Sequence, residues 1–187
     1  MASRAYLYSA NQDFTKLRDL SESKYPIPFF FKIILGVDAE ICKSQLWENY
    51  AHPIAIKSNF SKGLQFFYDL LEYLKTQEQI PTELIENSLN DTKDFFEKNS
   101  DKINDYFFLE AGEIFDMTGD GSIKDQNYDL WYDITYIHRS LQELLDIKPS
   151  DMFLKSLHSW FYDLKDQPEE HLSVYWKGVN FYSFNNT

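Results

Sequence analysis

The residues whose types and spacing come closest to a chemical motif lie in the segment Asp-Met-Thr-Gly-Asp-Gly-Ser-Ile, which runs from Asp116 to Ile123. In calcium loops of the EF-hand or dockerin type, side-chain oxygens at positions 1, 3 and 5 bind the ion, and a glycine at position 6 makes the sharp turn. This chain has at those positions Asp116, Thr118, Asp120 and Gly121. The pattern therefore indicates a candidate Ca²⁺ site between two helices.

The calcium pattern fails at position 12, where a bidentate carboxylate is expected and Asn127 stands. Thr118 is also a poorer ligand than Asp or Asn, so both charge and coordinating oxygens are missing. An ordinary turn between helices, formed by Gly119 and Gly121, is the competing interpretation. The sequence thus predicts a degenerate loop over residues 116–127, with weak Ca²⁺ binding at most and no other cofactor.

A second candidate is a metal site for hydrolysis. Glu110, Glu113 and Asp116 follow one another at intervals of three, which would align their carboxylates on one side of a helix, and His138 is the nearest candidate nitrogen ligand in that interpretation. No His-Glu-x-x-His or Cys-x-x-Cys pairing accompanies them. A solvated acidic face, with His138 as a core histidine on an apolar stripe, is the competing interpretation.

Other enzyme signatures are absent from the sequence. It has no Gly-x-Ser-x-Gly elbow, no phosphate-binding glycine loop with lysine, and no dinucleotide fingerprint. Cys42 is the single cysteine and lacks the histidine signature of a catalytic thiol, so a buried structural role is expected. We therefore expect a protein that is not an enzyme, with a metal-assisted hydrolase as an alternative.

An acidic and aromatic stripe is the best candidate for binding a partner. Asp125, Asp129 and Asp133 recur every four residues in a long helical pattern, with Trp131 and Tyr132 between them. Aromatic anchors surrounded by carboxylates suit a protein interface, in which the anchors provide affinity and the charges steer a basic partner. A solvated helix face beside core aromatics is the competing interpretation.

The charge of the chain limits the classes of partner. Thirty Asp and Glu residues against 18 Lys and Arg give a formal net charge of -12, and the basic residues are dispersed. Such a surface repels nucleic-acid phosphates and anionic lipid, whereas it attracts a basic protein or a cation. We therefore expect neither nucleic-acid nor membrane binding. A charge that merely keeps an aromatic-rich protein soluble is the alternative.

These candidate residues must be positioned by a mostly helical framework. Apolar residues at spacings of three and four predict helices over 29–35, 64–74, 81–98, 104–115, 125–145 and 150–167. Ser61 is the expected cap of the second helix and Ser150 of the last. A buried strand is the competing interpretation for 29–35. Alternating residues predict strands over 5–10 and 53–57, and a terminal strand or hairpin over 171–184.

Together these elements predict an α+β fold, a helix-dominated single domain over residues 1–187 with about five to six helices and a small, mainly antiparallel sheet. No export signal is visible, and the apolar run 27–37 is broken by Lys32 and far shorter than the ~20 residues of a spanning helix. Because a lone cysteine allows no internal disulfide, the reducing cytoplasm is the expected location.

The chain resembles a bacterial family of uncharacterised cytoplasmic proteins that open with a segment of the type Ala-x-Arg-x-Tyr-Leu-Tyr-Ser. The resemblance is carried by segments spread over most of the chain: Ala2–Ser9, Leu20–Glu22, Tyr25–Phe29, Lys32–Leu35, His52–Ala55 and Leu109–Asp116. None of these segments is a recognised catalytic motif, and the family has no established activity to transfer.

Members of that family look similar in size and acidity to immunity proteins, which neutralise toxins delivered by neighbouring bacteria through type VI or contact-dependent secretion. The resemblance therefore implies an immunity protein that occludes a cognate basic toxin. On this hypothesis the first residues to test are Asp125, Asp129, Asp133, Trp131 and Tyr132. A calcium-binding module and a metal-assisted hydrolase are the alternatives.

Overall fold

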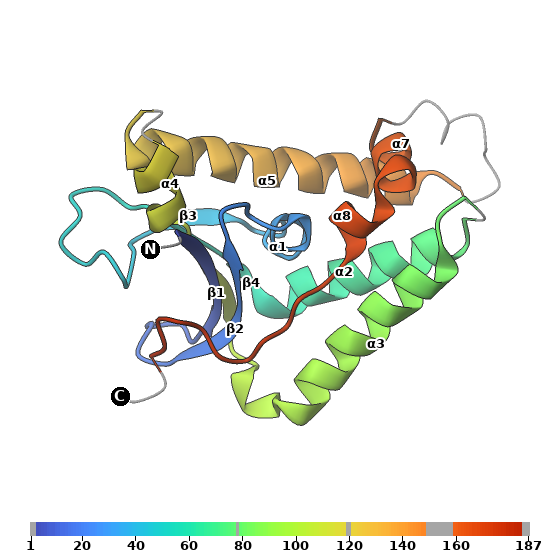
Figure 1. The fold of residues 1–187 in the computed structure, drawn as a ribbon. Helices are drawn as coiled ribbons and strands as arrows, with labels where there is room; N and C mark the ends of the chain where they lie inside the picture. Colours follow the sequence, from blue (N-terminus) through green and yellow to red (C-terminus); the bar gives the residue numbers. More distant parts are fainter. Residues whose placement is uncertain (1–2, 78, 119–120, 149–158, 185–187) are drawn as a thin grey trace.

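A five-stranded antiparallel sheet organises the molecule (Figure 1). A computed structural model describes residues 3–77, 79–118, 121–148 and 159–184, with the backbone alone for residues 159–162. The strands are β1 (Arg4–Ala10), β2 (Leu17–Lys24), β3 (Glu40–Cys42), β4 (Ala55–Asn59) and β5 (Tyr106–Glu110). Their order across the sheet is β2-β1-β5-β4-β3, and each neighbouring pair runs antiparallel.

The described residues form seven α-helices and one short 3-10 helix. They are α1 (Phe29–Ile34), α2 (Phe60–Lys75), α3 (Thr82–Lys98), the 3-10 helix η1 (Ser100–Lys102), α4 (Gly112–Thr118), α5 (Ile123–Asp146), α7 (Ser159–Asp166) and α8 (Pro168–Leu172). The expected helix-dominated α+β class with a small antiparallel sheet is confirmed. The predicted start of the last helix at Ser150 lies outside the described residues.

The two faces of the sheet are covered in different ways. Leu7 on β1 lies opposite Leu109 on β5, and both side chains join the core formed with the helices. Their neighbours Tyr8 and Phe108 are also paired, but they point to the opposite face, where a smaller aromatic cluster forms. Because side chains alternate along a strand, one register therefore creates both cores.

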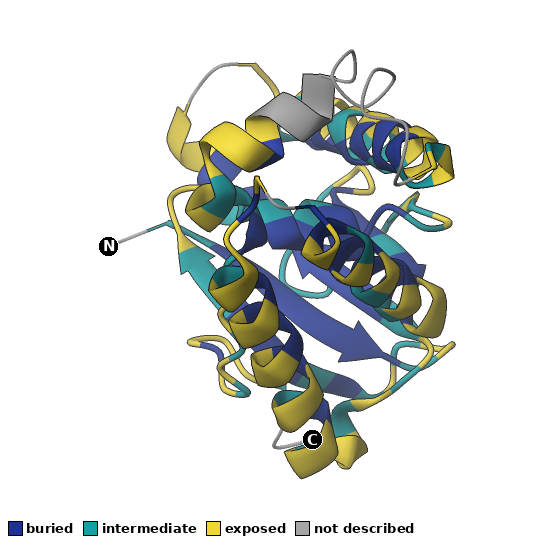
Figure 2. Ribbon diagram, turned by 90° about the vertical axis from the view of Figure 1, so that its right-hand side faces the viewer, coloured by how far each residue is buried: buried dark blue, intermediate teal, exposed yellow. Residues whose placement is uncertain are grey.

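Amphipathic helices supply the main core (Figure 2). In α2, Phe67, Leu70, Leu71 and Leu74 are fully buried at helical spacing. Gly63 allows this helix to approach α1, because a Cβ at that position would lie 2.1 Å from the carbonyl oxygen of Ile34. The cap of α2 is Asn59, whose side chain accepts a hydrogen bond from the Lys62 N–H at 3.0 Å, so the predicted Ser61 cap is wrong.

The predicted helix over 104–115 is wrong in its first half. Residues Tyr106–Glu110 form β5, the central strand of the sheet, and only Gly112–Thr118 is helical. Phe107 packs against the helices while Phe108 packs on the opposite face, and both are fully buried. A strand buried on both faces shows no alternation of apolar and polar residues, so its sequence resembles a helix segment.

The predicted terminal strand or hairpin over 171–184 is also wrong. Residues 168–172 form α8, and residues 173–184, here called the C-terminal segment, are extended without a strand assignment. The segment crosses β2 at a bulge, where Leu20 has no partner in the register with β1. The Leu20 carbonyl there accepts hydrogen bonds from the N–H groups of Lys177 and Gly178, at 2.9 and 3.0 Å.

Candidate functional site

The predicted partner-binding residues lie on α5, the longest helix, which runs along one edge of the molecule (Figure 1). Ser122 caps its start, since its side chain accepts a hydrogen bond from the Asp125 N–H at 3.1 Å. The buried side of the helix carries Leu130, Ile134, Ile137, Leu141 and Leu144. This apolar stripe fixes the rotation of α5 about its axis and therefore decides which residues face outward.

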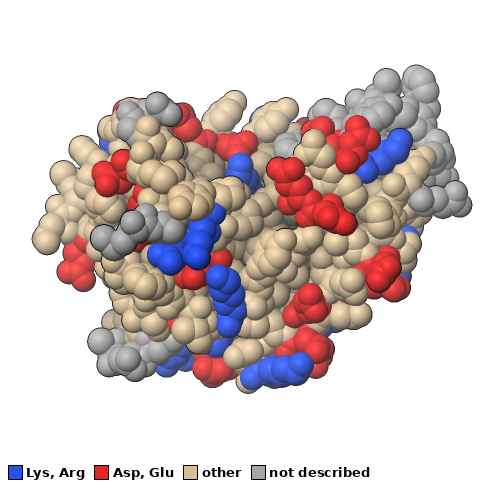
Figure 3. Space-filling view, viewed as in Figure 1, with Lys and Arg blue, Asp and Glu red and all other residues tan. Residues whose placement is uncertain are grey.

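The outward side of α5 combines tyrosines with carboxylates. Tyr128, Tyr132 and Tyr136 are 54%, 60% and 44% exposed, and Asp125 and Asp129 lie exposed among them. These five residues are here called the α5 outer face. Carboxylate side chains are visible along the edge of the molecule over α5 (Figure 3). Four-residue spacing puts Asp125 beside Asp129, and Tyr132 beside Tyr136, on one continuous strip.

Two of the five predicted partner-binding residues point elsewhere. Trp131 was expected to be exposed, but it is half-buried and its indole N–H donates to the Ala39 carbonyl at 2.9 Å. Asp133 lies on the flank of the helix, where its Oδ2 accepts from the Lys32 ammonium at 2.5 Å. Asp125, Asp129 and Tyr132 have the expected exposure, and Tyr128 and Tyr136 extend the surface.

The candidate calcium loop connects α4 to α5. Asp116 is exposed near the end of α4, and Gly121 has the positive φ of 107° that a glycine at position 6 provides. Asp120 lies outside the described residues. The Thr118 hydroxyl, expected as a ligand, donates to Gln126 Oε1 at 2.7 Å. Asn127, at position 12, is buried on the inner side of α5 and so faces the core.

The carboxylates expected to align on one helix lie on two different elements. Glu110 ends strand β5, whereas Glu113 and Asp116 belong to α4, so the predicted spacing does not place all three on one helix face. His138 lies on α5, with its imidazole 4.5 Å from the Phe66 ring between centroids. Within the described residues, no group of three or more His, Cys, Asp or Glu side chains is arranged to hold a metal ion.

A buried carboxyl, Glu110, lies near a half-buried thiol, Cys42, and the sequence does not predict this pair. Burial raises the pKa of the Glu110 carboxyl to about 7. Hydrogen bonds from Gln45, Ser44 and Leu46 lower this pKa and so offset part of the effect of burial. Burial and, to a smaller extent, the nearby charge of Glu110 raise the pKa of the Cys42 thiol to about 12. A thiol with that pKa is a weak nucleophile at neutral pH, as expected for a structural cysteine.

In the described part of the chain, no helix is long and apolar enough to cross a membrane. A family model described as a domain of unknown function (DUF7822) matches residues 5–149. This range includes all of α5 and the whole sheet except Arg4, the first residue of β1, and it ends before α7. No curated protein and no solved structure matches the chain.

Proposed function

The chain belongs to the DUF7822 family, a domain of unknown function, and we propose that it is a bacterial immunity protein. In this proposal it binds a cognate basic toxin, delivered by type VI or contact-dependent secretion, in the cytoplasm. It neutralises the toxin by covering the toxin's active site, without chemistry of its own. The observation that carries the proposal is the α5 outer face.

Charge is the first argument for a basic partner. The chain carries a formal net charge of -12, and Asp125 and Asp129 on the α5 outer face are exposed. Asp129 makes no hydrogen bond or ion pair within the described residues, so its charge is available to a partner. A surface with charges of one sign raises the association rate with an oppositely charged protein by about tenfold to a thousandfold, and this effect weakens as the salt concentration rises.

The tyrosines supply the second argument. Tyr128, Tyr132 and Tyr136 hold large rings in water with few rotatable bonds, so little conformational entropy is lost when a partner covers them. Tyrosine is enriched among the residues that contribute most to the affinity of protein interfaces. The α5 outer face thus combines aromatic anchors for affinity with carboxylates for steering, and the helix holds both on one side of the molecule.

The proposal is tested by co-expression with the toxic products of neighbouring genes. We expect the chain to restore growth against one basic toxin, and size-exclusion chromatography with light scattering to give a one-to-one complex. Purified toxin should lose its activity in proportion to the chain added, because occlusion is stoichiometric. Failure to protect against, or to form a complex with, any basic gene product of the neighbourhood would contradict the proposal.

A charge-reversal pair assigns the surface. Changing Asp125 and Asp129 to Lys should abolish protection. Glu143→Lys, which reverses one exposed carboxylate instead of two, is the control and should retain protection. Glu143 is exposed on the same helix, nearly four turns beyond Asp129, so its reversal alters the net charge without changing any of the five residues of the α5 outer face. Equal loss of protection in both variants would indicate a general charge effect and contradict the assigned surface.

A further inference from the structure

A separate feature of the molecule is a pocket where the start of β1, helix α4 and the C-terminal segment meet. Its volume is about 530 Å³, within the range of small-molecule sites. The pocket, here called the α4 pocket, is lined by Arg4, Trp47, Glu113, Asp116, Phe181 and Tyr182. Charged and aromatic side chains therefore surround one hollow, and none of its lining residues belongs to the α5 outer face.

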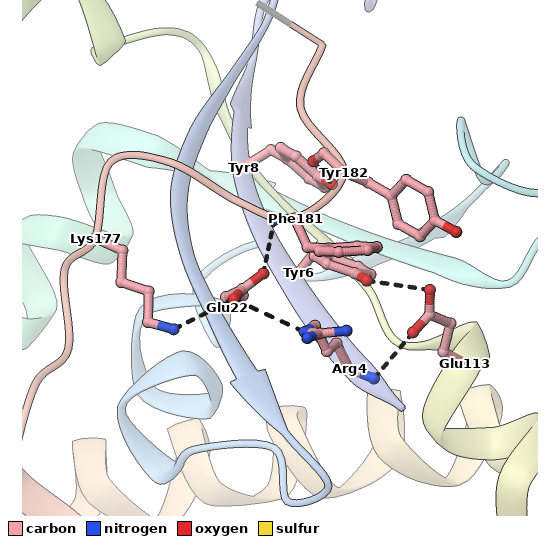
Figure 4. A network of polar contacts seen from close by, with 8 residues as sticks. All are labelled: Arg4, Tyr6, Tyr8, Glu22, Glu113, Lys177, Phe181 and Tyr182. Atoms are coloured by element: carbon pink, nitrogen blue, oxygen red, sulfur yellow. Dashed lines mark hydrogen bonds and ion pairs between the residues drawn. The ribbon is translucent and has the colours of Figure 1, made fainter. Parts of the chain in front are cut away.

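Two carboxylates of α4 face this pocket. The Glu113 carboxylate accepts hydrogen bonds from the Tyr6 hydroxyl and the Arg4 backbone N–H, both at 3.1 Å (Figure 4). These two bonds hold it in one orientation. Asp116 lies three residues further along, is exposed, and makes no hydrogen bond or ion pair within the described residues. One carboxylate is thus fixed, and the second is free to bind a ligand.

The positive charge in the pocket is already compensated. The Arg4 Nε lies 3.8 Å from Glu22 Oε1, and its guanidinium stacks over the Phe181 ring at 4.5 Å. Glu22 also binds the Lys177 ammonium at 3.3 Å and accepts from the Phe181 backbone N–H at 2.8 Å (Figure 4). Arg4 opposes two carboxylates among the lining residues, so the lining has one net negative charge.

Apart from Ser3, the remaining lining residues of the α4 pocket are aromatic. Phe181 and Tyr182 are 63% and 47% exposed, so ring surface is open to a ligand. Trp47 packs over Gly112, where an added Cβ would lie 3.0 Å from the indole Nε1. The negative face of an aromatic ring attracts a cation within about 6 Å of its centroid. The Arg4 guanidinium on the Phe181 ring is an internal example of this contact.

We propose that the α4 pocket binds an organic cation, an alkylammonium or guanidinium group, between the aromatic rings and the carboxylates of Glu113 and Asp116. An anion is disfavoured by the net negative lining. Ca²⁺ is disfavoured because it requires six to eight oxygen ligands, whereas the lining offers only two carboxylates beside three aromatic rings and an arginine. The site lies apart from the α5 outer face, and its existence does not depend on the immunity proposal.

Isothermal titration calorimetry of the whole chain with choline and agmatine tests the site. We expect saturable one-to-one binding, with a Kd on the order of 0.1–1 mM for a small cation held by rings and carboxylates. The neutral isostere of choline, 3,3-dimethylbutan-1-ol, should bind at least tenfold more weakly. Equal binding of the neutral alcohol, or no saturable binding of either cation, would overturn the proposal.

Two variants and one control place the cation. Asp116→Asn should weaken choline binding about fivefold, because the attraction between two unit charges about 4 Å apart in water is about 1 kcal/mol. Trp47→Leu should weaken it at least as much by removing a ring. Glu143→Gln, the same loss of charge far along α5, should leave affinity unchanged. Affinity equal in wild type and Asp116→Asn, or displacement of choline by equimolar Ca²⁺, would overturn the proposal.

Discussion

The Glu110 carboxylate accepts a hydrogen bond from the Gln45 backbone N–H, with 2.6 Å between the nitrogen and Oε1. The same oxygen accepts from the Leu46 N–H at 3.2 Å. Glu110 ends the central strand β5, and Gln45 and Leu46 belong to the connection between β3 and β4. One buried carboxylate therefore fastens this connection to the sheet. Its second oxygen, Oε2, has no hydrogen-bond partner within the described residues.

This arrangement predicts a pH dependence of stability. Burial raises the folded-state pKa of Glu110 from 4.5 to about 7. The folded state therefore binds the proton more tightly, so the contribution to stability is full below pH 4.5 and lost as pH rises through 7. Glu110→Gln cannot ionise. As pH rises from 4.5 to above 7, the free energy of unfolding of wild type should therefore fall by about 3 kcal/mol relative to that of the variant.

Urea denaturation of both proteins at pH 4.5, 6 and 8 measures that difference. Gln at position 110 retains an oxygen that can accept from the Gln45 and Leu46 N–H groups, so the variant isolates ionisation. Glu143→Gln, an exposed carboxylate, is the control and should track wild type at every pH. A difference between Glu110→Gln and wild type that stays constant with pH would show that this carboxyl does not titrate as proposed.

Gly63→Ala should destabilise the protein although alanine favours helix. A Cβ at Gly63 would lie 2.1 Å from the Ile34 carbonyl oxygen, so α1 and α2 must separate. Overpacking of this kind costs about 1–3 kcal/mol. In an exposed helix the same change would instead stabilise by about 1 kcal/mol. Thermal melts of Gly63→Ala and of the control Ser61→Ala, at an exposed position of α2, measure the change in stability. A melting temperature of Gly63→Ala above that of wild type would contradict the close helix contact.

Trp176 should anchor the C-terminal segment. Its ring stacks on Phe95 with 5.3 Å between centroids, and its indole N–H donates to Thr92 Oγ1 at 2.9 Å. Trp176→Ala should lower the free energy of unfolding by about 3 kcal/mol through lost packing. Tyr175→Ala, which removes a ring that is 60% exposed, is the matched control and should cost under about 1 kcal/mol. Similar losses in urea titrations of both variants would disprove the anchor.

Calcium should produce no saturable heat that depends on the loop. Position 12 is Asn127, which carries an amide in place of a carboxylate and faces the core, and the neighbouring Gln126 Nε2 donates to the Phe115 carbonyl at 3.1 Å. Calorimetry with Ca²⁺ should therefore give equal heats for wild type and for an Asp116→Ala, Asp120→Ala double variant. A saturable heat that the double variant loses would establish the calcium module instead.

The sequence predicted the elements that bury only one side. Helices α2, α3 and α5 each have one buried stripe against an exposed side, and a helical period reveals such an asymmetry directly. Strand β5 is buried on both faces, and its sequence therefore predicts a helix. Strand β2 was missed because its buried polar residues, such as Ser21, face the C-terminal segment rather than an apolar layer; the Ser21 hydroxyl donates to the Tyr175 carbonyl.

Only part of the α5 outer face could be predicted from the sequence. Spacings of four and three residues place Asp125, Asp129 and Tyr132 on one exposed strip, because the buried stripe of α5 leaves those positions outward. The inward turn of Trp131 depends on the Ala39 carbonyl, 92 residues away in the chain. The partner of Asp133, Lys32, is similarly remote at 101 residues. Local spacing contains no information about such long-range contacts.

The most direct measurement is the affinity of the purified one-to-one toxin complex as a function of salt, for wild type, the Asp125→Lys, Asp129→Lys double variant, and Tyr132→Ala. We expect the double variant to bind at least a hundredfold more weakly with a flatter salt dependence, and Tyr132→Ala to lose tenfold or more. Glu143→Lys should bind like wild type. Affinity and salt dependence equal to wild type in the double variant would contradict the assignment of the α5 outer face.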